Sequence, residues 1–182
     1  PNIMIKVPAT KQGITAIETL IGEGINVNVT LLFGVERYRE AALAYLAGLE
    51  KLLEAGGDIG RVASVASFFV SRVDTLLDPE LERKGRPDLA GRIAVANAKI
   101  AYGLFLELSR GDRWQALADK GAMPQRLLWA STGTKNPSYP DTLYIDELIG
   151  PHTVNTVPPA TLQAYLDHGS VEDRLGRGLD EA

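Results

Sequence analysis

Short apolar runs alternate with longer stretches of helical periodicity along the whole chain. Runs of this kind are typical of strands buried in a parallel sheet, and the longer stretches repeat apolar side chains at the spacing of amphipathic helices. Predicted strands cover residues 2–7, 26–33, 62–70, 126–131 and 152–156, and predicted helices cover residues 13–23, 35–55, 88–110, 141–149 and 159–167. The pattern therefore predicts an α/β fold of five βα units with crossover helices.

Two segments are interpreted in more detail because their patterns are clear. In the helix predicted at 88–110 we expect the core face to be formed by Ile93, Ala96, Ile100, Gly103, Leu104 and Leu108, with close packing at Ala94, Ala98 and Ala101. Residues 79–87 alternate in charge and lie between two prolines, which favours a solvated connection. We assign no chemistry to either segment.

Composition excludes several classes of function. The 182 residues contain no cysteine and two histidines, which excludes disulfides, zinc–thiolate sites and thiol nucleophiles. The 19 basic and 23 acidic residues are interspersed, so no basic stripe is offered to nucleic acid. The sequence also lacks an apolar run of membrane-spanning length and the zones of a secretory signal. We therefore expect a cytoplasmic protein with neither nucleic acid nor a membrane as partner.

Lys6 is the last residue of the second row of side chains on the first predicted strand, and its position suggests chemistry. Alternation places Ile3, Ile5 and Val7 on one face and Lys6 on the other, just before Pro8. Ligands of parallel α/β folds bind at the carboxyl ends of the strands. An amine that attacks a carbonyl must be neutral, and an apolar barrel interior disfavours its charged form. The alternative is a lysine that extends its ammonium group to solvent from a strand end.

The second predicted strand carries a row of polar residues on one face. Asn26, Asn28 and Thr30 share one parity, whereas Val27, Val29 and Leu31 share the other. We expect the polar row to lie beside Lys6 and the aliphatic row to pack against helices. From the residues alone, the row is either a ligand site or a hydrogen-bond network that fills the interior.

Residues 3–14, IMIKVPATKQGI, resemble the active-site signature of the transaldolases, which reads I-x-I-K, then V or L, P or A, A or S, and T-x-x-G. Residues 24–33, GINVNVTLLF, are similar to the next strand of that family. The resemblance continues through residues 66–74, 127–131 and 153–158, and so covers essentially the whole chain. The run WASTGTKNP at 129–137 looks like a longer bacterial subgroup, some of whose members are fused to a sugar-phosphate isomerase.

This resemblance implies an eight-unit (β/α) TIM barrel, which usually needs about 250 residues. Residues 1–182 would then be the C-terminal portion of a single barrel domain and supply about its last five βα units. Strands four to eight would be present, and the family's acid/base aspartate and assisting glutamate would precede Pro1. We therefore expect an isolated chain to be poorly active. We also expect a homo-oligomer or association with the missing N-terminal portion, because the outer strands would be unpaired edges.

The resemblance also assigns the site residues. It implies that Lys6 forms the Schiff base, that Asn28 binds a substrate hydroxyl, and that Thr30 positions the catalytic water. Ser67 would face the substrate, Phe69 would form a wall of the pocket, and no metal or organic cofactor would be needed. Asn155 and the histidines are interpreted as structural.

Phosphate binding is implied for Arg72, which matches an arginine that the family uses near the sugar phosphate. The alternative is a salt bridge to Asp74. Ser131 matches directly, but many transaldolases have A-S-F-R at this place, whereas Gly133 stands here two positions after the serine. Lys135 is the local candidate for the phosphate, since a glycine-containing loop beside a cation can surround an anion; a solvent-facing lysine is the alternative.

The activity implied is transfer of a dihydroxyacetone unit from sedoheptulose 7-phosphate or fructose 6-phosphate to an aldose phosphate, in the non-oxidative pentose phosphate pathway. Two alternatives stay open. A fructose-6-phosphate aldolase-like enzyme would release free dihydroxyacetone, but such enzymes are shorter and lack the NVNVTLLF run. A non-catalytic fragment or binding module is the other alternative.

Overall fold

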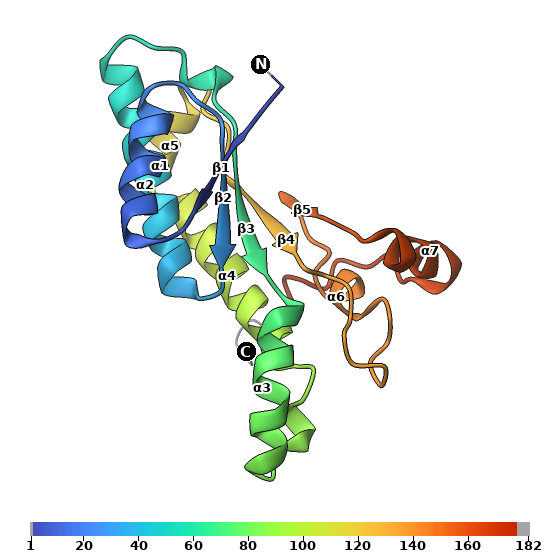
Figure 1. Cartoon of the computed structure of the whole chain (residues 1–182). Helices are drawn as coiled ribbons and strands as arrows, with labels where there is room; N and C mark the ends of the chain where they lie inside the picture. Colours follow the sequence, from blue (N-terminus) through green and yellow to red (C-terminus); the bar gives the residue numbers. More distant parts are fainter. Residues whose placement is uncertain (1, 178–182) are drawn as a thin grey trace. The chain divides into compact units, whose positions relative to one another are not determined.

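The computed structural model describes residues 2–177 and contains strands and helices in regular alternation (Figure 1). The strands are β1 (Ile5–Pro8), β2 (Val27–Leu32), β3 (Ser64–Phe69), β4 (Arg126–Ala130) and β5 (Thr153–Asn155). The helices are α1 (Lys11–Gly22), α2 (Val35–Glu54), α3 (Ser71–Arg83), α4 (Ile93–Arg110), α5 (Asp112–Ala118), α6 (Leu143–Asp146) and α7 (Pro159–His168), with 3₁₀ turns η1 (Ile59–Arg61) and η2 (Pro87–Leu89).

The five strands form one sheet in the order β1-β2-β3-β4-β5. β1 and β2 are parallel, and their register pairs Ile5 with Val27 and Val7 with Val29. The neighbours of the sheet follow the order of the chain, as expected for consecutive βα units. The α/β prediction with five strands is confirmed.

Two helices were not predicted. α3 extends over residues that include Pro79, so the solvated connection expected at 79–87 is wrong for its first half. The apolar residues of α3 recur at helical spacing, at Val73, Leu76, Leu77 and Leu81, but its buried side chains are Ser71 and Asp74, and Leu76 is 73% exposed. α5 is only seven residues long, too short for a clear periodic pattern.

The core face of α4 differs from the one expected. Its buried side chains are Ala94, Ala98, Ala101, Tyr102, Leu104 and Phe105. Ile100, expected in the core, is 41% exposed. Ala94, Ala98 and Ala101, which we expected to allow close packing, form the buried row of the helix. The β-branched residues Ile93 and Val95 are only half-buried beside this row.

The chain divides into two compact units, one up to Ser67 together with Leu104–Leu127, and one of Phe68–Gly103 with the described residues from Leu128 onward. In the first unit, α1 and α2 pack together, and Ile17, Ile21, Val27, Val29 and Leu49 are fully buried. In the second, Trp129 is fully buried, meets Phe68 edge-on with ring centroids 6.2 Å apart, and donates its Nε1–H to the carbonyl of Leu148 at 3.0 Å.

The alternation of β2 breaks at Leu31. This leucine has a left-handed backbone with φ 61° and is 45% exposed, while Leu32 takes the buried place. The expectation that Leu31 packs against helices is therefore wrong, because one left-handed residue reverses the side-chain alternation that follows it. Thr30 lies directly before this reversal, at the carboxyl end of β2.

Candidate active site

The lysine and the polar row of β2 lie side by side in the first unit. The register pairs Lys6 with Asn28 and Pro8 with Thr30. Paired residues on neighbouring strands project to the same face of a sheet. Lys6 and Asn28 therefore share a face of the sheet. Within residues 2–177, Lys6 is exposed to solvent.

Ser67 extends this row from β3. Its hydroxyl donates a hydrogen bond to Oδ1 of Asn28 at 2.7 Å. Because this bond engages the amide oxygen, the NH2 group is the part of Asn28 that offers hydrogens to a ligand. Asn26, one pair earlier, accepts the backbone N–H of Ala63 at 2.8 Å through its own Oδ1 and has a structural role. Lys6, Asn28 and Ser67 thus form a polar row across three strands.

Thr30 is the unusual member of β2. Its side chain is 6% exposed, and its Oγ1 has no hydrogen-bond partner among the described residues. An unpaired buried hydroxyl costs about 1–3 kcal/mol. Such a group is expected where a bound water or substrate completes the hydrogen bonding.

Phe69 and Arg72 lie together in the second unit. The guanidinium carbon of Arg72 is 4.8 Å from the centroid of the Phe69 ring, a cation–π contact. Arg72 is exposed and belongs to the first turn of α3. The alternative partner Asp74 is buried and is engaged by other donors, described below.

Ser131 follows β4 with a left-handed backbone of φ 58°. Its carbonyl accepts the backbone N–H of Ser71 at 3.0 Å, and the two hydroxyl oxygens are 2.9 Å apart. Ser71 is the residue before Arg72, so these two bonds tie the start of α3 to the end of β4. Sequence reasoning did not single out Ser71.

Lys135 lines a cavity of about 220 Å³ in the second unit and is itself exposed. The other charged residues of this cavity are Asp74, Asp78 and Glu82, all from α3. Three carboxylates surround the same space, and like charge disfavours an anion there. A phosphate that reached Lys135 would have to lie on the side of the ammonium group away from α3.

Two aspartate–tyrosine pairs border this cavity, and the sequence did not reveal them. Asp74 accepts the hydroxyl of Tyr144 at 2.7 Å and the amide of Ala94 at 2.8 Å. Asp78, one turn later, accepts the hydroxyl of Tyr139 at 2.6 Å and the amide of Gly91 at 3.2 Å. Both pairs therefore tie α3 to the segment before β5 and to the start of α4. In the sequence, the feature that could have pointed to these pairs is the spacing of Asp74 and Asp78 by one helical turn.

Burial sets the electrostatics of these pairs. Burial raises the pKa of Asp74, although its bonds from Tyr144 and the amide of Ala94 act in the opposite direction. Burial, with the neighbouring carboxylate of Asp78, raises the pKa of Tyr139 to about 12. The pKa of Tyr144 is raised as well, first by burial and then by Asp74. Both tyrosines are therefore hydrogen-bond donors at neutral pH.

The remaining candidates have structural contacts. Asn155 accepts the hydroxyl of Thr132 at 2.7 Å through Oδ1. His168 is exposed between Asp141 and Asp167, whose carboxylates raise its pKa. Within residues 2–177, no group of three or more histidines and acidic residues could hold a metal ion. In the same range, no helix is both long and apolar enough to cross a bilayer.

The fold is an α/β fold with one five-stranded sheet, and it places the polar row of Lys6, Asn28 and Ser67 on three neighbouring strands. The chain belongs to the transaldolase/fructose-6-phosphate aldolase family, whose model matches residues 1–182. It is 57% identical over 186 residues to Transaldolase 1 of Streptomyces avermitilis, and 52% identical over 193 residues to Transaldolase 2 of a Nostoc species. Both comparisons include 100% of this chain and 49% and 51% of the relative, so the chain spans about half their length.

Proposed function

We propose that the protein is a transaldolase, which transfers a dihydroxyacetone unit from a ketose phosphate to an aldose phosphate through a Schiff base on Lys6. Family membership and the names of the relatives support this proposal. The observation that carries it is the row formed by Lys6, Asn28 and Ser67, with the hydroxyl of Thr30, unpaired among the described residues, two residues further along β2. An amine flanked by groups that hydrogen-bond without titrating near neutral pH suits the addition of a lysine to a sugar carbonyl.

The reaction begins when the neutral Nζ of Lys6 adds to the ketone carbon of fructose 6-phosphate or sedoheptulose 7-phosphate. Loss of water gives an iminium ion at C2. The general base that the family resemblance places before Pro1 then takes the proton of the C4 hydroxyl, the C3–C4 bond breaks, and its electron pair moves to the iminium ion. The departing aldose phosphate leaves a three-carbon enamine on Lys6. Attack of this enamine on a second aldose phosphate forms the new carbon–carbon bond, and addition of water then releases the product ketose phosphate.

Asn28 and Thr30 have separate roles in this scheme. The NH2 group of Asn28 binds a hydroxyl of the substrate, and its oxygen is held by Ser67. The buried hydroxyl of Thr30 holds the water that is lost in iminium formation and added in hydrolysis, which would supply the partner that it lacks among the described residues.

For the substrate phosphate we propose Arg72, Ser131 and Lys135. The planar guanidinium group of Arg72 lies over Phe69 and keeps its edge N–H groups available for two phosphate oxygens. Ser131 is linked to Ser71 beside that arginine. Lys135 is the weaker ligand of the three, because the carboxylates of α3 line the same cavity.

At the scale of the whole protein, we propose that residues 1–182 are the C-terminal portion of a single (β/α) barrel domain. We further propose that the protein acts in the cytoplasm, in the non-oxidative pentose phosphate pathway, and either forms a homo-oligomer or pairs β1 and β5 with a preceding portion of the same domain. The coverage of about half of each relative supports the barrel proposal.

The test is reductive trapping on the protein at its full natural length. Incubation with fructose 6-phosphate and borohydride should leave a three-carbon adduct on Lys6, located by peptide mass spectrometry. Lys6→Ala should lose the adduct, whereas Lys11→Ala, an exposed lysine at the start of α1, should keep it. An adduct elsewhere, or none on a folded protein, would contradict the assignment of Lys6. Release of free dihydroxyacetone without an aldose phosphate acceptor would instead identify an aldolase.

A further inference from the structure

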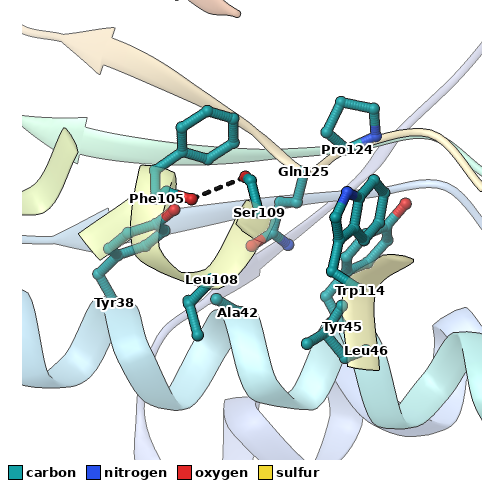
Figure 2. Close-up of a pocket in the computed structure, with 10 residues that line it drawn as sticks. All are labelled: Tyr38, Ala42, Tyr45, Leu46, Phe105, Leu108, Ser109, Trp114, Pro124 and Gln125. Carbon is teal, nitrogen blue, oxygen red and sulfur yellow. Dashed lines mark hydrogen bonds between the residues drawn. The ribbon is translucent and has the colours of Figure 1, made fainter. Parts of the chain in front are cut away.

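A hollow lined by aromatic and aliphatic side chains lies in the first unit, away from the residues discussed so far. Its walls come from α2, the last part of α4, α5 and the segment before β4, and they include Tyr38, Tyr45, Phe105, Leu108 and Trp114 (Figure 2). No residue that lines it is charged. The hollow has about 330 Å³ of empty space, a figure that includes open solvent at its mouth.

One polar atom of this hollow has no partner. Gln125 is 6% exposed and lines the hollow, yet its Oε1 accepts no hydrogen bond from the described residues. In Figure 2 its amide group lies between Ser109 and Trp114 and points towards α2. A buried amide oxygen without a donor costs about 1–3 kcal/mol, so a partner is expected.

The orientation of this amide is fixed by its neighbours. The hydroxyl of Ser64 donates its single hydrogen to the carbonyl of Val27 at 2.7 Å. Ser64 Oγ can therefore act only as an acceptor towards Gln125, and it lies 2.8 Å from Nε2. The NH2 group must face Ser64, which leaves the oxygen as the free end of the amide.

Two hydroxyl groups that line the hollow are satisfied from within the unit. Tyr45 donates its hydroxyl to the carbonyl of Met123 at 2.7 Å, and Ser109 donates to the carbonyl of Phe105 at 2.7 Å. Neither of these hydroxyl hydrogens is available to Gln125. A donor from a molecule that enters the hollow would complete the hydrogen bonding of the amide oxygen.

This hollow is distinct from the Lys6 row. Gln125 bonds to Ser64, the first residue of β3, whereas Ser67, which bonds to Asn28, comes three residues later. Three residues of strand correspond to about 10 Å. The hollow thus lies at the amino end of β3, and the contact with the Lys6 row lies further along that strand.

We propose that the hollow is a binding site for a small, uncharged aromatic molecule that carries one hydrogen-bond donor. The donor binds Oε1 of Gln125, and the ring contacts the aromatic walls. A charged ligand is excluded, because the lining offers no counter-charge for its desolvation.

The test compares phenol with toluene, which has the same ring and size but no donor. Titration calorimetry on the full-length protein should show one phenol site of roughly millimolar affinity, about five-fold tighter than toluene. Trp114 forms a wall of the site, so phenol should also change tryptophan fluorescence, and this change should be lost in Trp114→Phe. Equal binding of the two ligands would show that Gln125 is not used and would overturn the proposal.

A variant that leaves the hydrogen-bond chain intact supplies the second arm. Ala42 lines the hollow from α2, and Ala42→Leu should fill it and abolish phenol binding. A circular dichroism melt of Ala42→Leu checks that the variant is folded. Phenol binding that persists in this variant, or a wild-type protein that binds no phenol, would overturn the assignment. None of these measurements reads enzyme activity, so their outcome is independent of the proposed transaldolase function.

Discussion

The hydroxyl of Thr30 allows a test that separates catalysis from stability. It is buried and has no partner within residues 2–177, so Thr30→Val removes a desolvated polar group while keeping the shape of the side chain. We expect the free energy of unfolding to stay unchanged or rise by about 1 kcal/mol, and kcat to fall about a hundred-fold, as for loss of a group that assists proton transfer through water. Urea unfolding and steady-state kinetics on the full-length protein measure both.

Thr132 is the matched control for this substitution. It is buried like Thr30, but its hydroxyl donates to Asn155 at 2.7 Å. Thr132→Val should lower the free energy of unfolding by about 1–3 kcal/mol, because it leaves the amide oxygen of Asn155 unpaired. Equal losses of stability in the two variants would show that Thr30 has a structural partner and is not held for a ligand.

Asp74 predicts a dependence of stability on pH with a definite sign. Burial raises its pKa in the folded state, so the folded protein holds this proton at pH values where the unfolded chain, with a pKa of about 3.9, has released it. The free energy of unfolding should therefore fall, relative to Asp74→Asn, as pH rises from about 4 through the raised pKa of Asp74. Urea unfolding of both proteins across this range measures the difference.

Glu50 provides the control of opposite sign. Its carboxylate accepts two hydrogen bonds of 2.7 Å from Arg113, and these bonds lower its pKa. The contribution of Glu50 to the free energy of unfolding should therefore be present above its usual pKa and be lost as pH falls through the lowered pKa. The Glu50→Gln variant should not show this loss. If the free energies of unfolding of the wild type and of Asp74→Asn changed with pH in the same way, the fall in stability could not be assigned to Asp74.

At the residue scale, side-chain alternation predicted the site only where the contacts are local. Lys6 and Asn28 followed from the parity of two neighbouring strands, and Ser67 joined them through the family pattern. The bond between Asp74 and Tyr144 joins residues 70 positions apart, and no periodic pattern reports such a pair. Leu31 is exposed because its own backbone is left-handed, and side-chain alternation cannot predict such a backbone.

The connection from α3 to α4 illustrates the same limit for whole elements. Apolar periodicity found α1, α2, α4 and α7, because each has apolar positions at helical spacing. α3 also has apolar residues at helical spacing, Val73, Leu77 and Leu81, but its charged residues and Pro79 led to the prediction of a solvated connection from residue 79. Its buried contacts are hydrogen bonds to Asp74 from Tyr144 and Ala94, and hydropathy does not report such contacts.

Gly91 tests how tightly this connection is built. It has φ +73°, and a Cβ added there would lie 2.8 Å from Cζ of Tyr139, whereas Gly85 has φ +70° and open space around it. In both glycine-to-alanine variants the free energy of unfolding should fall by about 1 kcal/mol, because alanine is strained in a left-handed backbone. Gly91→Ala should lose about 1–3 kcal/mol more, because the methyl group displaces the ring that bonds to Asp78. Equal losses in urea unfolding would show that Tyr139 moves aside freely.

At the scale of the whole molecule, the sheet described here has two ends. The strand order begins at β1 and finishes at β5, so within residues 2–177 the outer side of β1 pairs with no further strand. Ile3 is 68% exposed and Ile5 48% exposed beside this edge. An exposed edge strand with apolar side chains is a template for pairing with another chain.

We therefore expect residues 1–182, prepared alone, to self-associate as concentration rises, measured by sedimentation velocity. Ile5→Lys should reduce the association, since a lysine on an edge strand disfavours edge-to-edge pairing. Leu166→Lys is the matched control, because Leu166 is 71% exposed on α7 and belongs to no strand. If the two substitutions reduce association equally, general hydrophobicity drives it. A monomer at every concentration would show that the edge of β1 is protected by other means, and would remove the reason for expecting β1 to need a neighbouring strand.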